Sequence, residues 1–412
     1  MTHKWIWPIA LAVISAGTAV QIAARDQTKT PPAATTSSSA TSPAPPAGHP
    51  RFDYGGNAAV VPATFIQNVS FFPVRLNDSK ASLFALDTST GITSIDPARA
   101  AEIGVAPDQQ GAFTLPGVLF SFNSLPQTKR DDFAAEIGRA YEGTLGVDFL
   151  SLVVAEIDFG RQTAQIFDPS VYKYSGRGSV FPLRLMNGMP LIRVRFSSPR
   201  GKEADADFAI DTSLIAGIVL SEKFGEAHKL VSPHPRGTKG YDPQLTGGQD
   251  VGLFRLRNFD IGHSTVPDVV AEVSRAKLPG VDDTKVAGVI GTGILRRFTV
   301  IFDYPHQQVI FDENTRFKDY DEEDKSGIAV VAKGTDLKTF EVVHVVPGTP
   351  AAEAGVKQGD IIAGINDEAA ADMTLASVRD LFRQVGHTYK IVLQRGDQTK
   401  QVTIQMRRLL QS

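Results

Sequence analysis

The chain has 412 residues, of which 42% are hydrophobic and 21% charged, so it is long enough for two or three ordinary globular domains. Its 42 basic and 45 acidic residues give a net charge of −3, and the lack of a long basic run argues against nucleic acid as a partner. Because the chain has no cysteine, disulfides, thiol catalysis, cysteine metal sites and a lipid-modified cysteine are all excluded.

Residues 1–24 have the layout of a secretory signal peptide or of a single membrane anchor. Lys4 precedes an apolar stretch that runs from Trp5 to Val20. Residues 25–52 are rich in Pro, Ser, Thr and Ala and have too few large apolar groups to fold, which predicts a disordered linker. We therefore expect an exported protein that is periplasmic, secreted or held on the outer side of the cytoplasmic membrane, with membrane contact through this segment alone.

An aspartate follows an apolar strand twice, because Phe84–Ser89 reads FALDTS and Phe208–Ser213 reads FAIDTS. An acid at the end of a buried strand is costly to keep ionised, so the doubled phrase indicates that the two acids are used as a pair. The sequence GTLG at 143–146 is echoed by GVIG at 288–291, and strand patterns surround both. This repeat predicts that the chain contains two halves with the same order of elements. Alternatively, each aspartate could have a purely structural role in a turn, where it bonds its own backbone.

The repeated halves are rich in strand patterns and poor in helical ones, which predicts two mainly β lobes at 53–175 and 176–318. Two short helices are expected. Pro97–Ile103 has proline in its first turn and a glycine stop, and Ser221–His228 has serine as its N-cap.

The patterning changes after a charged connector, 319–325, which we expect to be exposed. Residues 326–409 then form a separate domain of about 80 residues, within the usual size range for domains. Its expected strands and one helix are, in chain order, 327–331, 339–346, 375–384 (the helix), 389–394 and 400–405.

The doubled Asp-Thr-Ser and apolar-apolar-Gly motifs resemble the aspartic peptidases, most closely the bacterial retropepsin-like type that fuses two lobes in one chain. This resemblance covers roughly residues 55–315. The C-terminal part is similar to a bacterial PDZ domain, through Val346–Gly355 and Gly359–Asn366. The expected fold is therefore mainly β, with two pseudo-symmetric retropepsin-like lobes followed by a PDZ-like α+β domain.

The resemblance implies that Asp87 and Asp211 are the catalytic carboxylates of an endopeptidase that acts on polypeptide. Such a pair shares one proton, and the ionised acid activates a water that attacks the peptide carbonyl. The resemblance implies no metal and no cofactor.

Supporting roles follow from the same resemblance. Thr88 and Thr212 would bond to backbone of the opposite lobe, and Thr90 would support an outer carboxylate oxygen. Gly146 and Gly291 would lie behind the acidic loops, where a side chain would collide with backbone.

The family pattern has glycine where this chain has Ser89 and Ser213. If the turn requires a positive φ, each serine strains it by about 1 kcal/mol. This departure leaves open a catalytically inactive peptide-binding protein or an envelope scaffold that retains the peptidase fold. Gly247 and Gly248 resemble the bend of a hairpin flap over substrate, with an ordinary surface insertion as the alternative.

Other hydrolase chemistries have little support, because the chain has no His-Glu-x-x-His and no Gly-x-Ser-x-Gly. The PDZ-like domain could capture a peptide C-terminus by strand addition beside Gly327–Val331. It could equally serve as a module that only braces the lobes.

Overall fold

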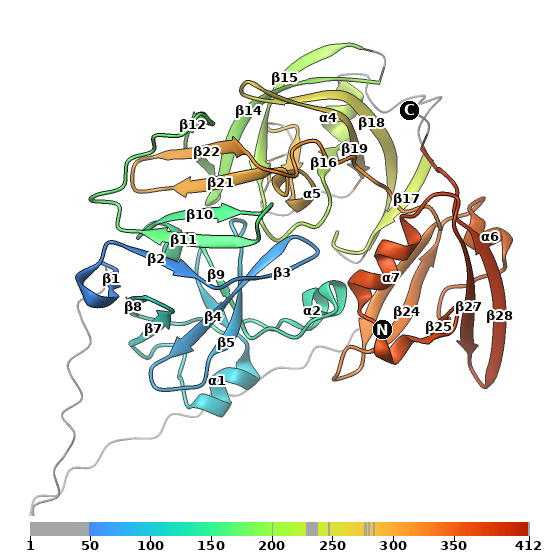
Figure 1. Ribbon diagram of the computed structural model, residues 1–412, viewed down its shortest axis with the longest axis horizontal. Coiled ribbons are helices and arrows are strands. Elements are labelled where there is room, and N and C mark those ends of the chain that lie inside the picture. The colour runs from blue at the N-terminus through green and yellow to red at the C-terminus, as the bar shows by residue number, and fades with distance from the viewer. Residues whose placement is uncertain are drawn as a thin grey trace, which may run out of the picture. The chain divides into compact units, whose positions relative to one another are not determined.

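The computed structural model describes residues 49–199, 201–227, 238–245, 248–275, 278, 281–282 and 285–410 (Figure 1). Residues Ala44–Ser412 form one compact unit. The predicted signal or anchor, 1–24, and most of the predicted linker lie outside the described residues. Within the span predicted as linker, Arg51–Phe52 already forms strand β1. No helix in the described part of the chain is both long and apolar enough to cross a membrane.

The first half is built on an eight-stranded sheet in the order β1-β8-β7-β4-β5-β9-β6, with β3 paired to β4. Its strands are β1 (Arg51–Phe52), β3 (Thr64–Ile66), β4 (Val69–Leu76), β5 (Ser82–Leu86), β6 (Ser94–Ile95), β7 (Gly111–Leu115), β8 (Val118–Phe122) and β9 (Gly143–Leu145). Its helices are η1 (Asp53–Gly55), α1 (Pro97–Ile103), α2 (Asp131–Ile137) and α3 (Val147–Leu150). Helix α1 confirms the prediction, since the Asp96 side chain caps its first turn and Gly104 ends it at a φ of 68°.

The second half has its own eight-stranded sheet, in the order β13-β14-β15-β20-β16-β19-β18-β17. Its strands are β13 (Arg184–Met186), β14 (Met189–Ser197), β15 (Glu203–Ile210), β16 (Ile218–Ser221), β17 (Thr238–Asp242), β18 (Gln249–Ile261), β19 (Ser264–Ser274) and β20 (Gly288–Ile290). Its helices are α4 (Glu222–Ala227) and α5 (Thr292–Leu295). In β14 the buried Val194 and Phe196 alternate with the exposed Arg195, as expected for a strand with one face in the core.

A six-stranded sheet joins the two halves in the order β12-β22-β21-β10-β11-β2. The first half contributes β2 (Ala58–Val61), β10 (Val154–Asp158) and β11 (Thr163–Phe167), and the second contributes β12 (Ser179–Pro182), β21 (Phe298–Asp303) and β22 (Gln308–Glu313). Strands β10 and β21 pair antiparallel across the junction. The halves also share one continuous hydrophobic core, in which Phe72 and Phe84 of the first belong to the same cluster as Phe196 and Phe208 of the second. They therefore pack as one body.

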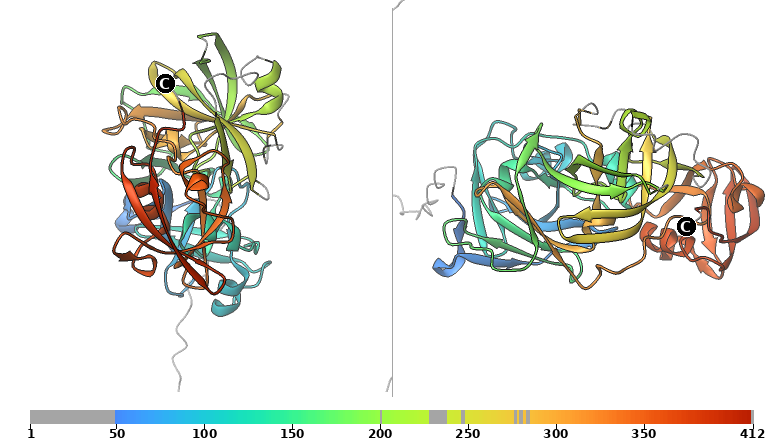
Figure 2. Two further views of the ribbon diagram at one scale, coloured as in Figure 1. Left: turned by 90° about the vertical axis from the view of Figure 1, so that its right-hand side faces the viewer. Right: turned by 90° about the horizontal axis from the view of Figure 1, so that it is seen from above.

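The C-terminal domain has a separate core and a sheet in the order β23-β24-β25-β27-β28, with β26 paired to β25. Its elements are β23 (Ile328–Lys333), β24 (Thr339–Val345), α6 (Pro350–Glu353), β25 (Ile361–Ile365), β26 (Glu368–Ala369), η2 (Ala370–Asp372), α7 (Leu375–Phe382), β27 (Thr388–Arg395) and β28 (Gln398–Gln405). Both views of Figure 2 place this domain, in orange and red, beside the yellow strands of the second half, and the rings of Tyr241 and His344 stack there at 4.4 Å.

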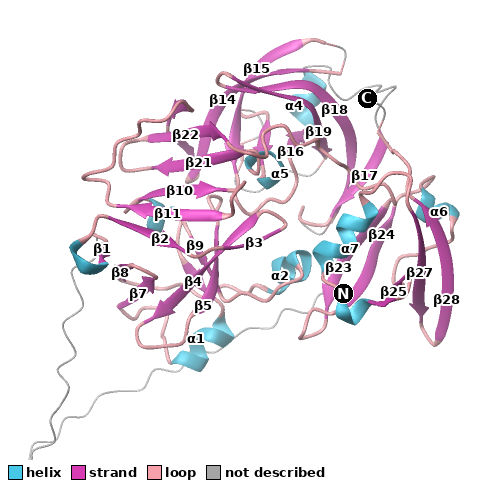
Figure 3. Cartoon of the chain, in the orientation of Figure 1, coloured by secondary structure: helices cyan, strands magenta, loops and turns pink. Residues whose placement is uncertain are grey.

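The fold is mainly β, as the cartoon in Figure 3 shows. One expectation is wrong in part, because only the beginning of the connector 319–325 is exposed. Glu323 is buried and forms an ion pair with Arg255, and the ammonium group of the buried Lys325 lies 2.8 Å from Glu323 Oε1. The buried charges of Glu323 and Lys325 are compensated by ion pairs with each other and with Arg255, which composition alone does not reveal.

Candidate active site

Asp87 and Asp211 occupy matching places in the two halves. β5 runs parallel to β9 and ends immediately before Asp87, whose backbone N–H donates to Leu145 O at 3.0 Å. β15 runs parallel to β20 and ends immediately before Asp211, whose N–H donates to Ile290 O at 2.9 Å. The doubled phrase in the sequence is thus a doubled structure, with each acid at the carboxyl end of a buried strand.

The residues after the two acids tie the halves together. The Thr88 hydroxyl donates to Ile210 O and the Thr212 hydroxyl donates to Leu86 O, both at 2.7 Å. The backbone N–H of each threonine in turn donates to the hydroxyl of the other. Because each bond connects one acidic turn to the other, these four buried bonds hold Asp87 and Asp211 next to each other.

Hydroxyl and amide donors surround both carboxylates. Asp87 Oδ1 accepts from the Ser89 N–H at 2.8 Å and from the Ser89 hydroxyl at 2.6 Å, and Asp87 Oδ2 accepts from the Thr90 hydroxyl at 3.0 Å. Asp211 Oδ1 accepts from the Ser213 N–H at 2.8 Å, from the Ser213 hydroxyl at 2.7 Å and from the Leu214 N–H at 3.2 Å. These bonds orient each acid, and those to Asp211 favour its ionised form.

The expected strain at Ser89 and Ser213 does not arise. Neither residue is among the described residues with a positive φ, so the condition under which serine would cost energy is not met. Instead, each serine adds a hydroxyl bond to its own aspartate. The substitution of serine for glycine therefore supports the acids, and the sequence could not show this because backbone φ depends on the folded turn.

The two acids influence each other electrostatically. Burial, together with the negative charge of Asp87, raises the pKa of Asp211 to about 6, and the hydrogen bonds from Ser213 and Leu214 partly oppose this rise. Two carboxyls in this relationship hold a proton between them more readily than either would alone.

Gly146 and Gly291 lie directly behind the acidic loops. A Cβ at Gly146 would lie 2.8 Å from Thr90 O, and one at Gly291 would lie 2.3 Å from Ala216 O and 2.6 Å from Leu214 O. All three contacts are too short for real atoms, so only glycine fits without displacement of the backbone.

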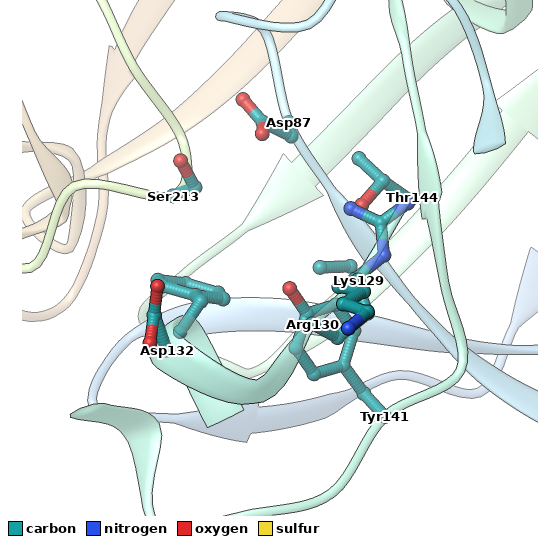
Figure 4. Close-up of a pocket in the computed structure, with 9 residues that line it drawn as sticks. Asp87, Lys129, Arg130, Asp132, Tyr141, Thr144 and Ser213 are labelled. Carbon is teal, nitrogen blue, oxygen red and sulfur yellow. The ribbon is translucent and has the colours of Figure 1, made fainter. Parts of the chain in front are cut away.

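A pocket of about 280 Å³ opens beside Asp87 (Figure 4). It is lined by Ala85, Asp87, Lys129, Arg130, Asp132, Phe133, Tyr141, Thr144 and Ser213. The Arg130 guanidinium lies over the Tyr141 ring at 5.8 Å, and burial raises the pKa of Tyr141 to about 12. The pocket thus combines apolar walls with charged groups next to one of the two acids.

Sequence reasoning missed most of this wall, because it did not predict α2. The residue before that helix, Arg130, forms no side-chain cap, and the helix has only seven residues. The acidic residues Asp131 and Asp132 in its first turn were the available signal.

The predicted flap corresponds to the hairpin of β17 and β18. Gly247 lies outside the described residues, and Gly248 lies at the bend with a φ of 66°. Gln244 of the same bend accepts from the Ile215 N–H at 2.6 Å and donates to Ser213 O at 3.1 Å. The hairpin is therefore attached to the second acidic turn.

Metal-dependent and serine-based hydrolysis find no site among the described residues. In the part of the chain that the structure describes, no cluster of His, Asp and Glu could hold a metal ion. Ser179 Oγ lies 2.8 Å from His263 Nδ1, but it also accepts from the His263 N–H, and no described carboxylate is bonded to His263. This serine and histidine form a structural contact at the start of β12.

Comparison with known proteins identifies the C-terminal domain. Residues 341–395 match the PDZ domain family model, so this part of the chain is a PDZ domain. The chain is similar to the Serine protease HTRA1 of Xenopus tropicalis, with 35% identity over 63 residues. That match covers 15% of this chain and 13% of the length of HTRA1.

Among solved structures, the chain is similar to the photosystem II D1 C-terminal processing protease, with 24% identity and a TM-score of 0.19. This match covers 20% of this chain and 22% of that one. The chain is thus mainly β and contains a PDZ domain, and its similarity to HTRA1 covers only a small part of either protein.

Proposed function

We propose that this protein is an exported aspartic endopeptidase. Two retropepsin-like lobes hydrolyse peptide bonds, and a PDZ domain binds peptides or regulates the peptidase. The observation that carries the proposal is the reciprocal bonding of Thr88 and Thr212, which joins the two acidic turns. Two carboxyls that share a proton can activate water without a metal or cofactor.

The pKa of Asp211, raised to about 6, favours this acid as the holder of the shared proton. Asp87 then takes a proton from a water whose oxygen bonds to the peptide carbonyl carbon. Asp211 keeps its proton and donates a hydrogen bond to the carbonyl oxygen, which stabilises the developing oxyanion. When the C–N bond breaks, the proton on Asp87 passes to the leaving amine, and a carboxylic acid and an amine are released.

A polypeptide substrate agrees with the pocket beside Asp87, which offers a place for one substrate side chain next to the reacting bond. Its walls are provided by Phe133 and Tyr141, with Lys129 and Arg130 near them. The hairpin that carries Gln244 borders the other acid and could close over the substrate, as proposed for a flap.

The second candidate is a peptide-binding protein without hydrolytic activity, which the PDZ domain favours. Backbone strain does not favour this candidate, since Ser89 and Ser213 have negative φ and bond their aspartates.

The experiment is an assay of the compact unit Ala44–Ser412 on unfolded casein from about pH 3 to about pH 8, with Asp87→Asn and Asp211→Asn as paired variants. We expect each variant to lose at least about 100-fold in rate, because each acid takes part in proton transfer. Ser179→Ala should retain activity, which would show that the Ser179–His263 pair does not take part in catalysis. If the wild type and both aspartate variants are equally inert, the peptide-binding candidate replaces the peptidase.

A further inference from the structure

The C-terminal end of α2 contacts both β23 and α7 of the PDZ domain. Helix α2 packs against β23. Gly138, which ends α2, lies so close to α7 that an added Cβ would lie 2.6 Å from Leu375 Cβ. Leu337, which follows β23, packs on the apolar cluster that contains Ala134 and Ile137 of α2. Figure 3 shows α2 beside α7 and β23.

Arg379 of α7 connects the parts of this contact. Its Nη2 donates to Glu136 Oε1 at 2.6 Å and to Val330 O on β23 at 2.7 Å. Its Nη1 donates to the Glu136 backbone oxygen at 2.9 Å and to Gln67 Oε1 at 2.7 Å. The side chains of Arg379 and Glu136 are only 15% and 8% exposed, so these charge-assisted bonds are largely shielded from water.

Strand β23 is the terminal strand of the PDZ sheet, and β24 is its partner there. A peptide that extends this sheet must donate its own backbone N–H groups to carbonyls of β23. Arg379 already donates to one such carbonyl, Val330 O, and α2 packs on the same strand. The chain's own Arg379 and α2 therefore already contact the strand to which a peptide would add.

The start of β23 also bears on the kind of peptide that fits. A peptide that adds antiparallel to β23 would bring its carboxyl end to the beginning of this strand. There the N–H groups of Ser326 and Gly327 donate to Asp324 Oδ1 at 2.9 and 2.5 Å, and the Ile328 N–H donates to Ser326 Oγ at 3.0 Å. Because these donors are taken, the groove suits an internal extended segment better than a free C-terminal carboxylate.

The other end of α2 belongs to the candidate active site. Asp132 and Phe133 of its first turn line the pocket beside Asp87, and Arg130 precedes the helix there (Figure 4). A second connection runs through the β17–β18 hairpin, since Tyr241 stacks on His344 of the PDZ domain while Gln244 bonds Ser213 O. Both elements that border the acidic turns therefore contact the PDZ domain.

We propose that an internal extended polypeptide segment competes with α2 and Arg379 for the edge of β23. Binding of such a segment breaks the Arg379–Glu136 and Arg379–Val330 bonds, releases the C-terminal end of α2 and changes the shape of the pocket beside Asp87. Peptide binding in the PDZ groove is thereby coupled to the candidate active site. Only the effect on cleavage rests on the proposed function, whereas the competition itself does not.

The test measures binding in a chain that carries Asp87→Asn and Asp211→Asn. Because this chain lacks both acids of the proposed peptidase, the outcome does not depend on whether the protein cleaves peptides. Two random peptide libraries displayed on phage serve as probes, one with free carboxyl ends and one with both ends fused to coat protein. They are selected on this chain and on the same chain with Arg379→Met. Arg383→Met is the matched control, because Arg383 lies next to α7 and its guanidinium lies 3.0 Å from Asp380 of that helix. Glu136→Gln weakens the same contact from the other side if Arg379→Met does not fold.

We expect Arg379→Met to enrich peptides from the fused library and to bind them at least about tenfold more tightly than the parent chain does. The reason is that the variant lacks the charge-assisted bonds with which the peptide must compete. The control variant should bind them as the parent does, and added peptide should increase amide hydrogen exchange in α2. Equal affinity for parent and variant, enrichment from the free-carboxyl library alone, unchanged exchange in α2, or no enrichment from either library would each overturn the proposal.

Discussion

Thr88 and Thr212 are separated by 124 positions in the chain, yet the N–H of each donates to the hydroxyl of the other, at 3.1 and 3.2 Å. Their own hydroxyls donate to the carbonyls that precede the opposite aspartates. Both threonines are fully buried. The placement of one carboxyl relative to the other is thus set by bonds that water does not reach, and this accounts for the value of threonine at both positions.

Replacement of Thr212 by valine should destabilise the protein. Valine has a similar shape but cannot donate to Leu86 O or accept from the Thr88 N–H, so two buried groups lose a partner. Each unsatisfied group costs about 1–3 kcal/mol, which should lower the free energy of unfolding measured by urea denaturation. The exposed Thr399→Val serves as the control and should change this free energy by less than about 0.5 kcal/mol. Equal effects for the two variants would contradict the role of Thr212.

Gly291→Ala should lower the unfolding temperature. The added methyl would lie 2.3 Å from Ala216 O, and relief of such overpacking typically costs about 1–3 kcal/mol. Gly91→Ala is the matched control, because a Cβ at Gly91 would meet nothing within 4 Å. Calorimetry on the two variants should separate them clearly, and an unchanged unfolding temperature for Gly291→Ala would show that the backbone there moves freely.

The rate of peptide hydrolysis should decrease as the pH rises above about 6. Asp211, with its pKa raised to about 6 by burial and by the charge of Asp87, loses the shared proton above this pH. Both acids are then ionised and neither can donate to the oxyanion, so kcat/KM should fall about tenfold for each further pH unit. A pH profile of casein cleavage checks this prediction. An activity that rises steadily from pH 6 to 8 would be inconsistent with a shared proton.

Ser213→Ala should move this upper pH limit to a higher value. The Ser213 hydroxyl bonds the ionised form of Asp211 and so lowers its pKa, and loss of the bond removes this effect. Ser151→Ala is the control, since Ser151 is exposed and bonds only helix backbone at Val147 O. The measurement is the high-pH limb of kcat/KM for the two variants. Coincident limbs would mean that the serine has no influence on the acid.

The parts of the site that could be predicted from sequence are those with a local and repeated signal. The doubled Asp-Thr-Ser and the doubled glycine marked residues that the structure places at matching strand ends, and the short helix α1 had a proline in its first turn and a glycine stop. The retropepsin-like assignment of the lobes remains a prediction from these motifs. Helix α2 was missed because a short helix without a cap has little intrinsic signal.

Other features could not be predicted because they depend on contacts between distant residues. The bond between Arg379 and Glu136 joins positions 243 apart, and the burial of Glu323 and Lys325 depends on ion pairs made only in the folded chain. Charged residues usually indicate an exposed segment, so composition predicted the wrong environment for the end of the connector. The negative φ of Ser89 and Ser213 is likewise a property of the folded turn.

The pH dependence of stability should report on Glu136. Burial raises its pKa from 4.5 to about 7, although Arg379 partly opposes the rise. Between these two values the folded chain holds a proton that the unfolded chain has lost, so stability is greatest at low pH and decreases as the pH rises towards 7. A shift of this size corresponds to up to about 3 kcal/mol across the window.

Glu136→Gln cannot titrate and should remove this component, while other buried acids such as Asp211 contribute equally to both proteins. Urea unfolding at several pH values between about 4.5 and about 8 gives the difference between wild type and variant. Parallel curves for the two proteins would show that Glu136 keeps an ordinary affinity for protons at its contact with the PDZ domain.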